Sequence, residues 1–267
     1  MIHEMNLHPA PYSSISSEKK DIELRLFDEK RRKIRAGDVI RFRNTKSGEV
    51  LECVAKTVHT APDFSEIYEK FDKVRLGYSE GDEAHPSDME EYYSREEIEK
   101  YGACGIELLL LRCVTPAILV DLGICPTCFD RENGGALYGD KTDKILYEDE
   151  LIECFLVGNP RAPGHVAISS KEHYKDMMEI PRDLCSYIFS FASSAMRVIR
   201  RVYSSASVYL CTMCDGPMNH FHVQLIPRYA HEERGSKNFV KNREEYVHDD
   251  EKIKLLREGI RSEISEL

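Results

Sequence analysis

The residues best suited to chemistry form a short alternating run near the end of the chain. His220, His222 and Gln224 are separated by single apolar residues, and Gln224 is the only glutamine in the sequence. In a strand, alternate side chains share a face, so this spacing predicts a polar strip with neighbours about 7 Å apart. A neutral imidazole can attack phosphorus, and its neighbours can hold ring nitrogens and phosphoryl oxygens. The strip by itself is as compatible with a polar or metal-binding face as with phosphate chemistry.

A second group with metal-ligand spacing is Cys125-Pro-Thr-Cys128. The chain has nine cysteines, an odd number, and its first residues lack the pattern of a secretory leader. These features argue against a disulfide framework and favour a reducing compartment, the cytosol by default. A rival interpretation joins this pair to Cys211 and Cys214 in a four-cysteine site, although the latter two would face opposite sides of a strand.

Composition limits the classes of function. The 267 residues are 42% hydrophobic and 31% charged, which is typical of a soluble chain with one or two globular domains. The net charge of −10 gives no overall indication of nucleic-acid binding, but a local basic face remains compatible with it. No apolar run approaches the roughly 18 residues of a membrane span, so we expect no membrane partner.

The elements that must position these groups fall into two halves. Before about residue 113 the pattern predicts strands and turns with helical insertions. One of the helices opens with a capping pattern at Ser94 and Glu97 and ends at Gly102. The predicted strands are 22–26, 39–43, 49–58 and 105–111, and the other predicted helix is 64–71.

The second half predicts an antiparallel sheet with a long amphipathic helix. That helix, 181–203, has apolar residues at helical spacing and a basic end that suits its dipole. A Pro/Gly loop at 159–164 precedes one of the strands, and a charged helical tail ends the chain. The predicted strands are 144–147, 151–157, 165–169, 207–213 and 220–227.

These motifs, in this order, resemble the histidine-triad (HIT) superfamily over about residues 125–229. The resemblance rests on His-x-His-x-Gln followed by apolar residues and Pro-Arg, and on Gly164-His165 after the Pro-rich loop. With Gln224 in the third position, the motif resembles that of the galactose-1-phosphate uridylyltransferase and dinucleoside-polyphosphate phosphorylase branch. The resemblance implies that His222 is the nucleophile and forms a nucleotidyl-histidine. It assigns the remaining roles to Gln224 on the phosphoryl oxygens, Gly216 and Asn219 near the phosphate, and His165 beside the catalytic strand.

The same resemblance implies a structural zinc ion. Uridylyltransferase-like and several bacterial HIT proteins hold zinc with a cysteine pair and two histidines. The matching ligands here are Cys125, Cys128, His173 and His220. Four nitrogen and sulfur ligands would close a tetrahedral site and fix the strand of the nucleophile.

The first half resembles an ASCH domain, a relative of the PUA-type RNA-binding barrel, over about residues 1–112. The resemblance rests on the Lys-x-x-Glu-x-Arg strand and implies that Lys20, Glu23 and Arg25 face an RNA or modified-nucleoside ligand. Some small members cleave acetylated cytidine, but Glu23 replaces their Thr, so that activity is not carried over. The basic run 30–46, which contains one acid, could also meet phosphates; the alternative is a solvated loop and strand edge.

The sequence therefore predicts an α+β protein: a PUA-like β-barrel (1–113), an apolar connector (114–124) that docks the halves, a HIT domain (125–235) and a charged helical tail (236–267). The leading hypothesis is a nucleotidyl hydrolase or nucleotidyltransferase acting on a nucleotide conjugate. The alternative is a non-catalytic RNA- or nucleotide-binding protein with a zinc-stabilised HIT fold. It is favoured by Val157, which replaces a ribose-binding acid or amide, and by a short phosphate segment. A third hypothesis puts deamidation or deacylation in the barrel cleft. The HIT resemblance also implies a homodimer.

Overall fold

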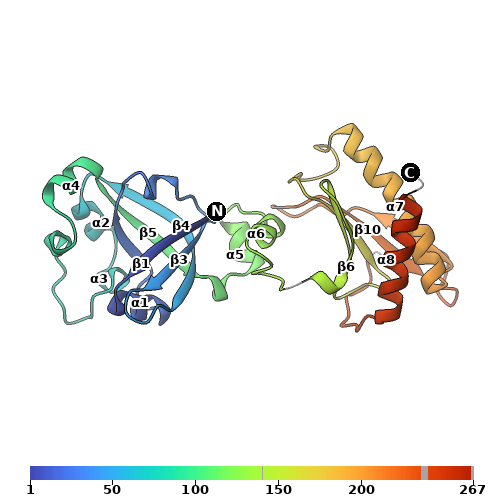
Figure 1. The fold of residues 1–267 in the computed structure, drawn as a ribbon, viewed down its shortest axis with the longest axis horizontal. Helices are drawn as coiled ribbons and strands as arrows, with labels where there is room; N and C mark the ends of the chain where they lie inside the picture. Colours follow the sequence, from blue (N-terminus) through green and yellow to red (C-terminus); the bar gives the residue numbers. More distant parts are fainter. Residues whose placement is uncertain (140, 236–239, 266–267) are drawn as a thin grey trace. The chain divides into compact units, whose positions relative to one another are not determined.

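The computed structural model describes residues 1–139, 141–235 and 240–265 (Figure 1). The chain divides into two compact units, Met1–Leu137 and Tyr138–Leu267. Each unit contains one five-stranded sheet with helices, so the predicted α+β class is confirmed. Among the helices in the described ranges, none combines the length and apolar character of a transmembrane segment.

The sheet of the first unit is a curled half-barrel. Its strands run in the order β1-β3-β4-β5-β2, with β1 parallel to β3 and the other pairs antiparallel. In the described chain β1 and β2 are edges of the sheet, so hydrogen bonding does not close the predicted barrel. The strands are β1 (Ile2–Leu7), β2 (Ile22–Leu26), β3 (Val39–Asn44), β4 (Val50–Ala61) and β5 (Ala103–Leu110).

The helices of this unit are short and capped by local sequence. Ser94 accepts a hydrogen bond from the amide of Glu97, and Gly102 ends the helix at φ 74°, as the capping pattern predicts. The helices are α1 (Pro9–Ser16), α2 (Phe64–Lys70), α3 (Lys73–Leu76), α4 (Arg95–Tyr101), α5 (Pro116–Asp121) and α6 (Pro126–Glu132), with 3-10 turns at Arg31–Lys33, Pro86–Glu91 and Leu111–Cys113.

The apolar connector packs within the first unit. Leu119 of α5 and Phe129 of α6 are buried in a cluster with Val39 and Val54 of the sheet. Ile124 fills the space beside Gly37, where an added Cβ would lie 2.6 Å from its Cδ1. The segment that carries the cysteine pair is therefore held by apolar contacts rather than by a free linker.

The second unit is an antiparallel sheet with the order β6-β7-β8-β10-β9. Val223 and Leu225 of β10 belong to the core formed with α7 and α8, so His222 and Gln224 project from the opposite face. The elements are a 3-10 turn (Thr142–Lys144), β6 (Ile145–Glu148), β7 (Ile152–Leu156), β8 (Val166–Ser170), α7 (Arg182–Tyr203), β9 (Ser207–Cys211), β10 (His222–Arg228) and α8 (Asp250–Ile264).

The predicted charged tail contains a helix that belongs to this core. Ile253, Leu256 and Ile260 of α8 are buried, and α8 lies alongside α7 (Figure 1). Gly259 allows the close approach, because an added Cβ would lie 2.6 Å from a methyl group of Val198. Residues 236–239 and 266–267 of the predicted tail lie outside the described residues.

The histidine strand begins two residues later than predicted. The predicted strand was 220–227, but β10 begins at His222, and the amide of Phe221 donates 2.7 Å to the carbonyl of Tyr174 instead of joining the ladder. His220 therefore precedes the strand. This bond ties the chain before β10 to the loop that carries His173.

Candidate functional site

His222 is held as a neutral imidazole with a defined tautomer. Its Nδ1 lies 2.9 Å from the carbonyl oxygen of His220, which can only accept, so Nδ1 carries the proton. The Nε2 lone pair then faces the amide nitrogen of Gln224 at 3.2 Å, and that amide is the donor. Burial lowers the pKa of His222 below its ordinary value, which favours the neutral ring. The available lone pair is the one that a nucleophilic histidine needs.

His165 lies beside Gln224 and is fully buried. Its Nδ1 accepts a hydrogen bond from the backbone amide of Arg161 at 3.1 Å, so Nε2 carries the proton. Burial lowers the pKa of His165 to about 3, with further lowering by Arg243 and Arg161, so the ring stays neutral. Within the described ranges, Nε2 of His165 and Oε1 of Gln224 are both buried without a hydrogen-bond partner. One is a donor and the other an acceptor, so His165 is suited to orient the Gln224 amide.

The turn before the histidines is closed by Asn219. Its Oδ1 accepts from the amide of Gly216 at 3.1 Å, and its Nδ2 donates 2.9 Å to the Gly216 carbonyl. The Gly216 amide, which the resemblance assigns to phosphate, is thus engaged with Asn219. A phosphate could bind this amide only if the Asn219 side chain moved.

Val157 is an apolar residue at the sequence position where the resemblance leads one to expect a ribose contact. It is buried, its amide donates 3.0 Å to the carbonyl of His165, and its own carbonyl accepts from Nε2 of His248 at 2.9 Å. No side-chain polar group of Val157 is available for a sugar hydroxyl. This position differs chemically from the acid or amide that the resemblance leads one to expect.

The cysteine pair sits at the start of α6. Cys125 is the N-cap residue and Cys128 lies in the first turn, a spacing that brings the thiols together. A hydrogen bond with Cys125 is the largest cause of a raised pKa at Cys128, followed by burial. A metal ion bound by this pair would displace the thiol protons.

The two predicted histidine ligands lie next to each other. The rings of His173 and His220 have centroids 5.3 Å apart at an interplanar angle of 73°. Nε2 of His220 lies 2.7 Å from the carbonyl oxygen of Ser170, so Nε2 donates and Nδ1 carries the lone pair that a metal would use. A backbone carbonyl that fixes a histidine tautomer in this way is typical of metal-binding histidines.

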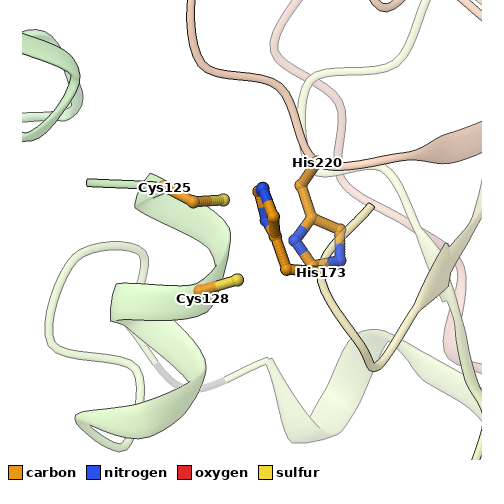
Figure 2. A group of neighbouring side chains, drawn as sticks. All are labelled: Cys125, Cys128, His173 and His220. Atoms are coloured by element: carbon orange, nitrogen blue, oxygen red, sulfur yellow. The ribbon is translucent and has the colours of Figure 1, made fainter. Parts of the chain in front are cut away.

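Figure 2 shows the donor groups of Cys125, Cys128, His173 and His220 directed toward one another. Their ligand atoms lie within 4.8 Å of one another, and two sulfur and two nitrogen ligands are a donor set that zinc prefers. Cys211 lies in β9 and Cys214 beyond its end, where its sulfur is 3.5 Å from the hydroxyl of Thr212. In the described parts of the chain, the predicted Cys2His2 group forms and the four-cysteine alternative does not.

In the first unit, Lys20, Glu23 and Arg25 line a cleft of about 640 Å³. Glu23 is buried, with Oε2 3.0 Å from Nζ of Lys20 and Oε1 2.8 Å from Nη2 of Arg25. Burial opposes ionisation of this carboxyl most strongly, but the two cations outweigh it and lower the pKa of Glu23. Sequence reasoning did not assign a role to the polar aromatic lining of the cleft, which comprises Tyr68, Tyr78, Tyr92 and Tyr93.

The basic run 30–46 is largely engaged in local contacts. Arg31 pairs with Asp28 at 2.7 Å, and Arg41 pairs with Glu52 at 2.6 Å. Other guanidinium groups of the run donate to backbone carbonyls. These contacts favour a mainly structural role for the run over a continuous phosphate-binding face.

Comparison with known proteins identifies two families. The HIT domain family matches residues 139–231, and the ASCH domain family matches residues 5–112. An uncharacterized HIT-like protein of Methanocaldococcus jannaschii is 31% identical over 94 residues, which cover 34% of this chain and 73% of that protein. The chain therefore belongs to the HIT family, and its HIT domain follows an ASCH domain.

Solved structures are similar to part of this chain. A protein of Pyrococcus furiosus, solved by NMR, is 33% identical with a TM-score of 0.34 and covers 42% of this chain and 98% of its own. A zinc-bound histidine triad family protein from Mycobacterium smegmatis is 20% identical with a TM-score of 0.42, over 54% of this chain and 97% of its own.

Proposed function

We propose that the protein is a nucleotidyl hydrolase or nucleotidyltransferase that acts through a covalent intermediate on His222. The observation that carries the proposal is the tautomer of His222: Nδ1 donates to the His220 carbonyl, and the Nε2 lone pair faces the Gln224 amide. The amide donor of Gln224 favours an unprotonated Nε2, and burial lowers the pKa of His222 despite the opposite effect of the His220 carbonyl. Gln224 also supplies an amide donor beside the reacting nitrogen.

In the first step, Nε2 of His222 attacks the α-phosphorus of a nucleotide conjugate. The N–P bond forms, the bond from phosphorus to the leaving group breaks, and the leaving group departs with the electron pair. The Gln224 amide turns from Nε2 to a phosphoryl oxygen. A carboxamide has no proton to give at neutral pH, so the leaving group departs as an anion or is protonated by water.

In the second step, water or an acceptor hydroxyl attacks the same phosphorus. The N–P bond breaks, its electron pair returns to Nε2, and the proton of the attacking group passes to solvent. The products are the nucleotide or its transfer product and the original neutral histidine. The tautomer of His222 is preserved because the His220 carbonyl holds the Nδ1 proton throughout.

We also propose that Cys125, Cys128, His173 and His220 bind a structural zinc ion. The donor chemistry fits, and the Ser170 carbonyl supports the required tautomer of His220. The metal would act as a crosslink without an open coordination position. It would fix the ring of His220, whose backbone carbonyl orients His222.

A second candidate function is nucleotide or RNA binding without turnover. The apolar side chain of Val157 and the turn that Asn219 closes favour it. Neither offers the polar contacts that the resemblance implies for the catalytic branch. For the ASCH cleft we propose an RNA or modified-nucleoside ligand, because Lys20 and Arg25 supply cationic donors and the tyrosines supply stacking surfaces. Chemistry at Lys20 and Glu23 is disfavoured, since their ion pair engages both groups.

The test is turnover of a panel of nucleotide conjugates by the full chain and by His222→Ala, with His231→Ala as a matched histidine control. His231 stacks on Tyr229 and has no role in the proposed mechanism. The proposal predicts release of nucleotide by the parent chain and His231→Ala, and none by His222→Ala. Equal turnover by His222→Ala refutes the mechanism; RNA binding without any turnover supports the second candidate.

A further inference from the structure

A hydrogen-bonded chain of two tyrosines and an acid runs along the wall of the ASCH cleft. Tyr68 belongs to α2, Tyr78 and Asp88 lie between α3 and α4, and all three residues line the cleft. The hydroxyl oxygens of Tyr68 and Tyr78 lie 2.8 Å apart, and the Tyr78 hydroxyl lies 2.8 Å from Oδ2 of Asp88. The same Oδ2 accepts from the amide of His85 at 3.0 Å, which holds the carboxylate in place.

The direction of each hydrogen bond in this chain follows from the charge of Asp88. The His85 amide and next the Tyr78 hydroxyl lower the pKa of Asp88, so the carboxyl is ionised at neutral pH and can only accept. The single proton of Tyr78 therefore points to Asp88. The contact between the two hydroxyls then needs the proton of Tyr68, so Tyr68 donates to Tyr78. What the Tyr68 hydroxyl can still offer to a ligand is a lone pair, so it is a fixed acceptor.

Lys20 supplies a donor to the same cleft. Its ammonium lies 3.0 Å from Oε2 of Glu23, and an ammonium has three protons, so this ion pair leaves protons for a ligand. The stem of Lys20 runs against Gly77, where an added Cβ would lie 2.9 Å from its Cδ. Gly77 directly precedes Tyr78 in the chain. This contact brings the lysine next to the segment that carries the tyrosine chain.

Another part of the cleft lining suits a flat ring. Tyr92 lines the cleft with 61% of its surface exposed, and its ring centroid lies 6.4 Å from that of His8, which also lines the cleft. Aromatic side chains stack on unpaired bases in this way. The volume of about 640 Å³ lies within the range of sites for small molecules.

We propose that this cleft binds the amidine edge of an unpaired cytosine or adenine, and that Tyr68 sets the preference. In both bases an amino group stands next to an unprotonated ring nitrogen, so the amino group would donate to Tyr68 and the ring nitrogen would accept from Lys20. Uracil and hypoxanthine reverse both groups, and an oxo oxygen would then face the lone pairs of Tyr68. Tyr68 could donate to that oxygen only by breaking its bond to Tyr78. The inference rests on the RNA or nucleoside ligand proposed for this cleft and names its class of base.

The experiment measures binding of matched amino and oxo ligands to the full chain by calorimetry. The pairs are cytidine with uridine and adenosine with inosine, as free nucleosides and within short single-stranded oligoribonucleotides. We expect the amino member of each pair to bind about tenfold more tightly, because the oxo member loses one hydrogen bond or is opposed there. Preference among free nucleosides identifies a nucleoside as sufficient, whereas preference among oligonucleotides alone identifies RNA as the source. Equal affinities, or preference for the oxo member, overturn the proposal.

Three substitutions separate the tyrosine chain from a general effect on the cleft. Tyr78→Phe removes the acceptor of the Tyr68 proton, so Tyr68 can donate to an oxo group, and the preference should fall to about twofold or less. Tyr68→Phe removes the fixed acceptor and should weaken binding of the amino ligands about tenfold. The control Tyr101→Phe, at the end of α4 where Lys100 lies over the ring, should change neither affinity nor preference. A preference that survives intact in Tyr78→Phe refutes the role of the chain.

Failure of this inference and failure of the proposed ligand give different results. Equal binding of both members of each pair would overturn the amidine assignment and leave a cleft that binds nucleosides or RNA. No binding of any nucleoside or oligonucleotide would refute the proposed ligand together with the inference. The preference of the parent chain decides between these results, so the test does not depend on the folding of a variant. Nucleosides carry no phosphate, so their binding is independent of the reaction proposed for His222.

Discussion

Replacement of Glu23 by glutamine tests the electrostatics of the ASCH cleft. The carboxylate is 4% exposed and bridges Nζ of Lys20 at 3.0 Å and Nη2 of Arg25 at 2.8 Å. Glutamine keeps the shape of the side chain but removes its charge. The buried cation of Lys20 and the partly buried cation of Arg25 would then face each other with one neutral amide between them.

The expected loss of stability in Glu23→Gln follows from the burial of the two cations that remain. Removing one partner of a buried ion pair costs about 3–5 kcal/mol, because the other charge stays buried without compensation. Arg25 retains a hydrogen bond to the carbonyl of Asn6 at 2.8 Å, and the cleft admits some water. We therefore expect a loss at the lower end of this range. A loss of about 3 kcal/mol raises the equilibrium constant for opening of the folded structure by a factor on the order of 100.

Hydrogen exchange measured by mass spectrometry on the full chain reports this loss at β2 and β5, whose amides pair with each other. The matched control is Glu52→Gln, which breaks a surface pair with Arg41 whose side chains are 36% and 41% exposed. The control should cost less than about 1 kcal/mol. If both variants accelerate exchange at their own strands by the same small factor, water screens the cleft carboxylate and our reasoning is wrong.

The pH dependence of the same measurement has a defined sign. Lys20 and Arg25 hold the pKa of Glu23 below its ordinary value of 4.5, so its stabilisation is complete above that pH. The stabilisation is lost as the pH falls through the lowered pKa of the folded protein. The difference between the parent chain and Glu23→Gln should therefore shrink on acidification well below pH 4.5.

Three further changes test other parts of the account. Cys128→Ser should reduce bound zinc from about one ion per chain to a small fraction, measured by elemental mass spectrometry; unchanged zinc content contradicts the ligand set. Gly164→Ala should destabilise the HIT domain by about 2 kcal/mol or more in urea, because the residue has φ +78° and its Cβ would lie 2.7 Å from the Tyr203 ring. Leu256→Ala should cost about 3 kcal/mol in the same assay, since α8 completes the core; a change below about 1 kcal/mol would indicate that the helix is dispensable.

The local pattern of the sequence was sufficient to predict the central elements of the fold. Period-two alternation and the histidine motif identified β10, and apolar residues at helical spacing identified α7 within one residue of its start. The capping pattern at Ser94 fixed the start of α4. Each of these signals depends on neighbours in the chain, which a single sequence displays directly.

Features that depend on distant partners were missed or only partly predicted. Strand β1 was not predicted, because only Met5 and Leu7 of it are buried and its parallel pairing with β3 has no local signal. The start of β10 moved because Tyr174, far away in sequence, binds the Phe221 amide.

The most direct test of the central claim is to locate the covalent intermediate. The full chain is incubated with nucleoside diphosphates and other nucleotide conjugates, quenched at alkaline pH because phosphohistidine is acid-labile, digested, and mapped by tandem mass spectrometry. The account predicts one nucleotidyl group on the peptide that contains His222, assigned to that residue and absent from His222→Ala. A nucleotidyl group on another residue, or turnover that persists in His222→Ala, would contradict it.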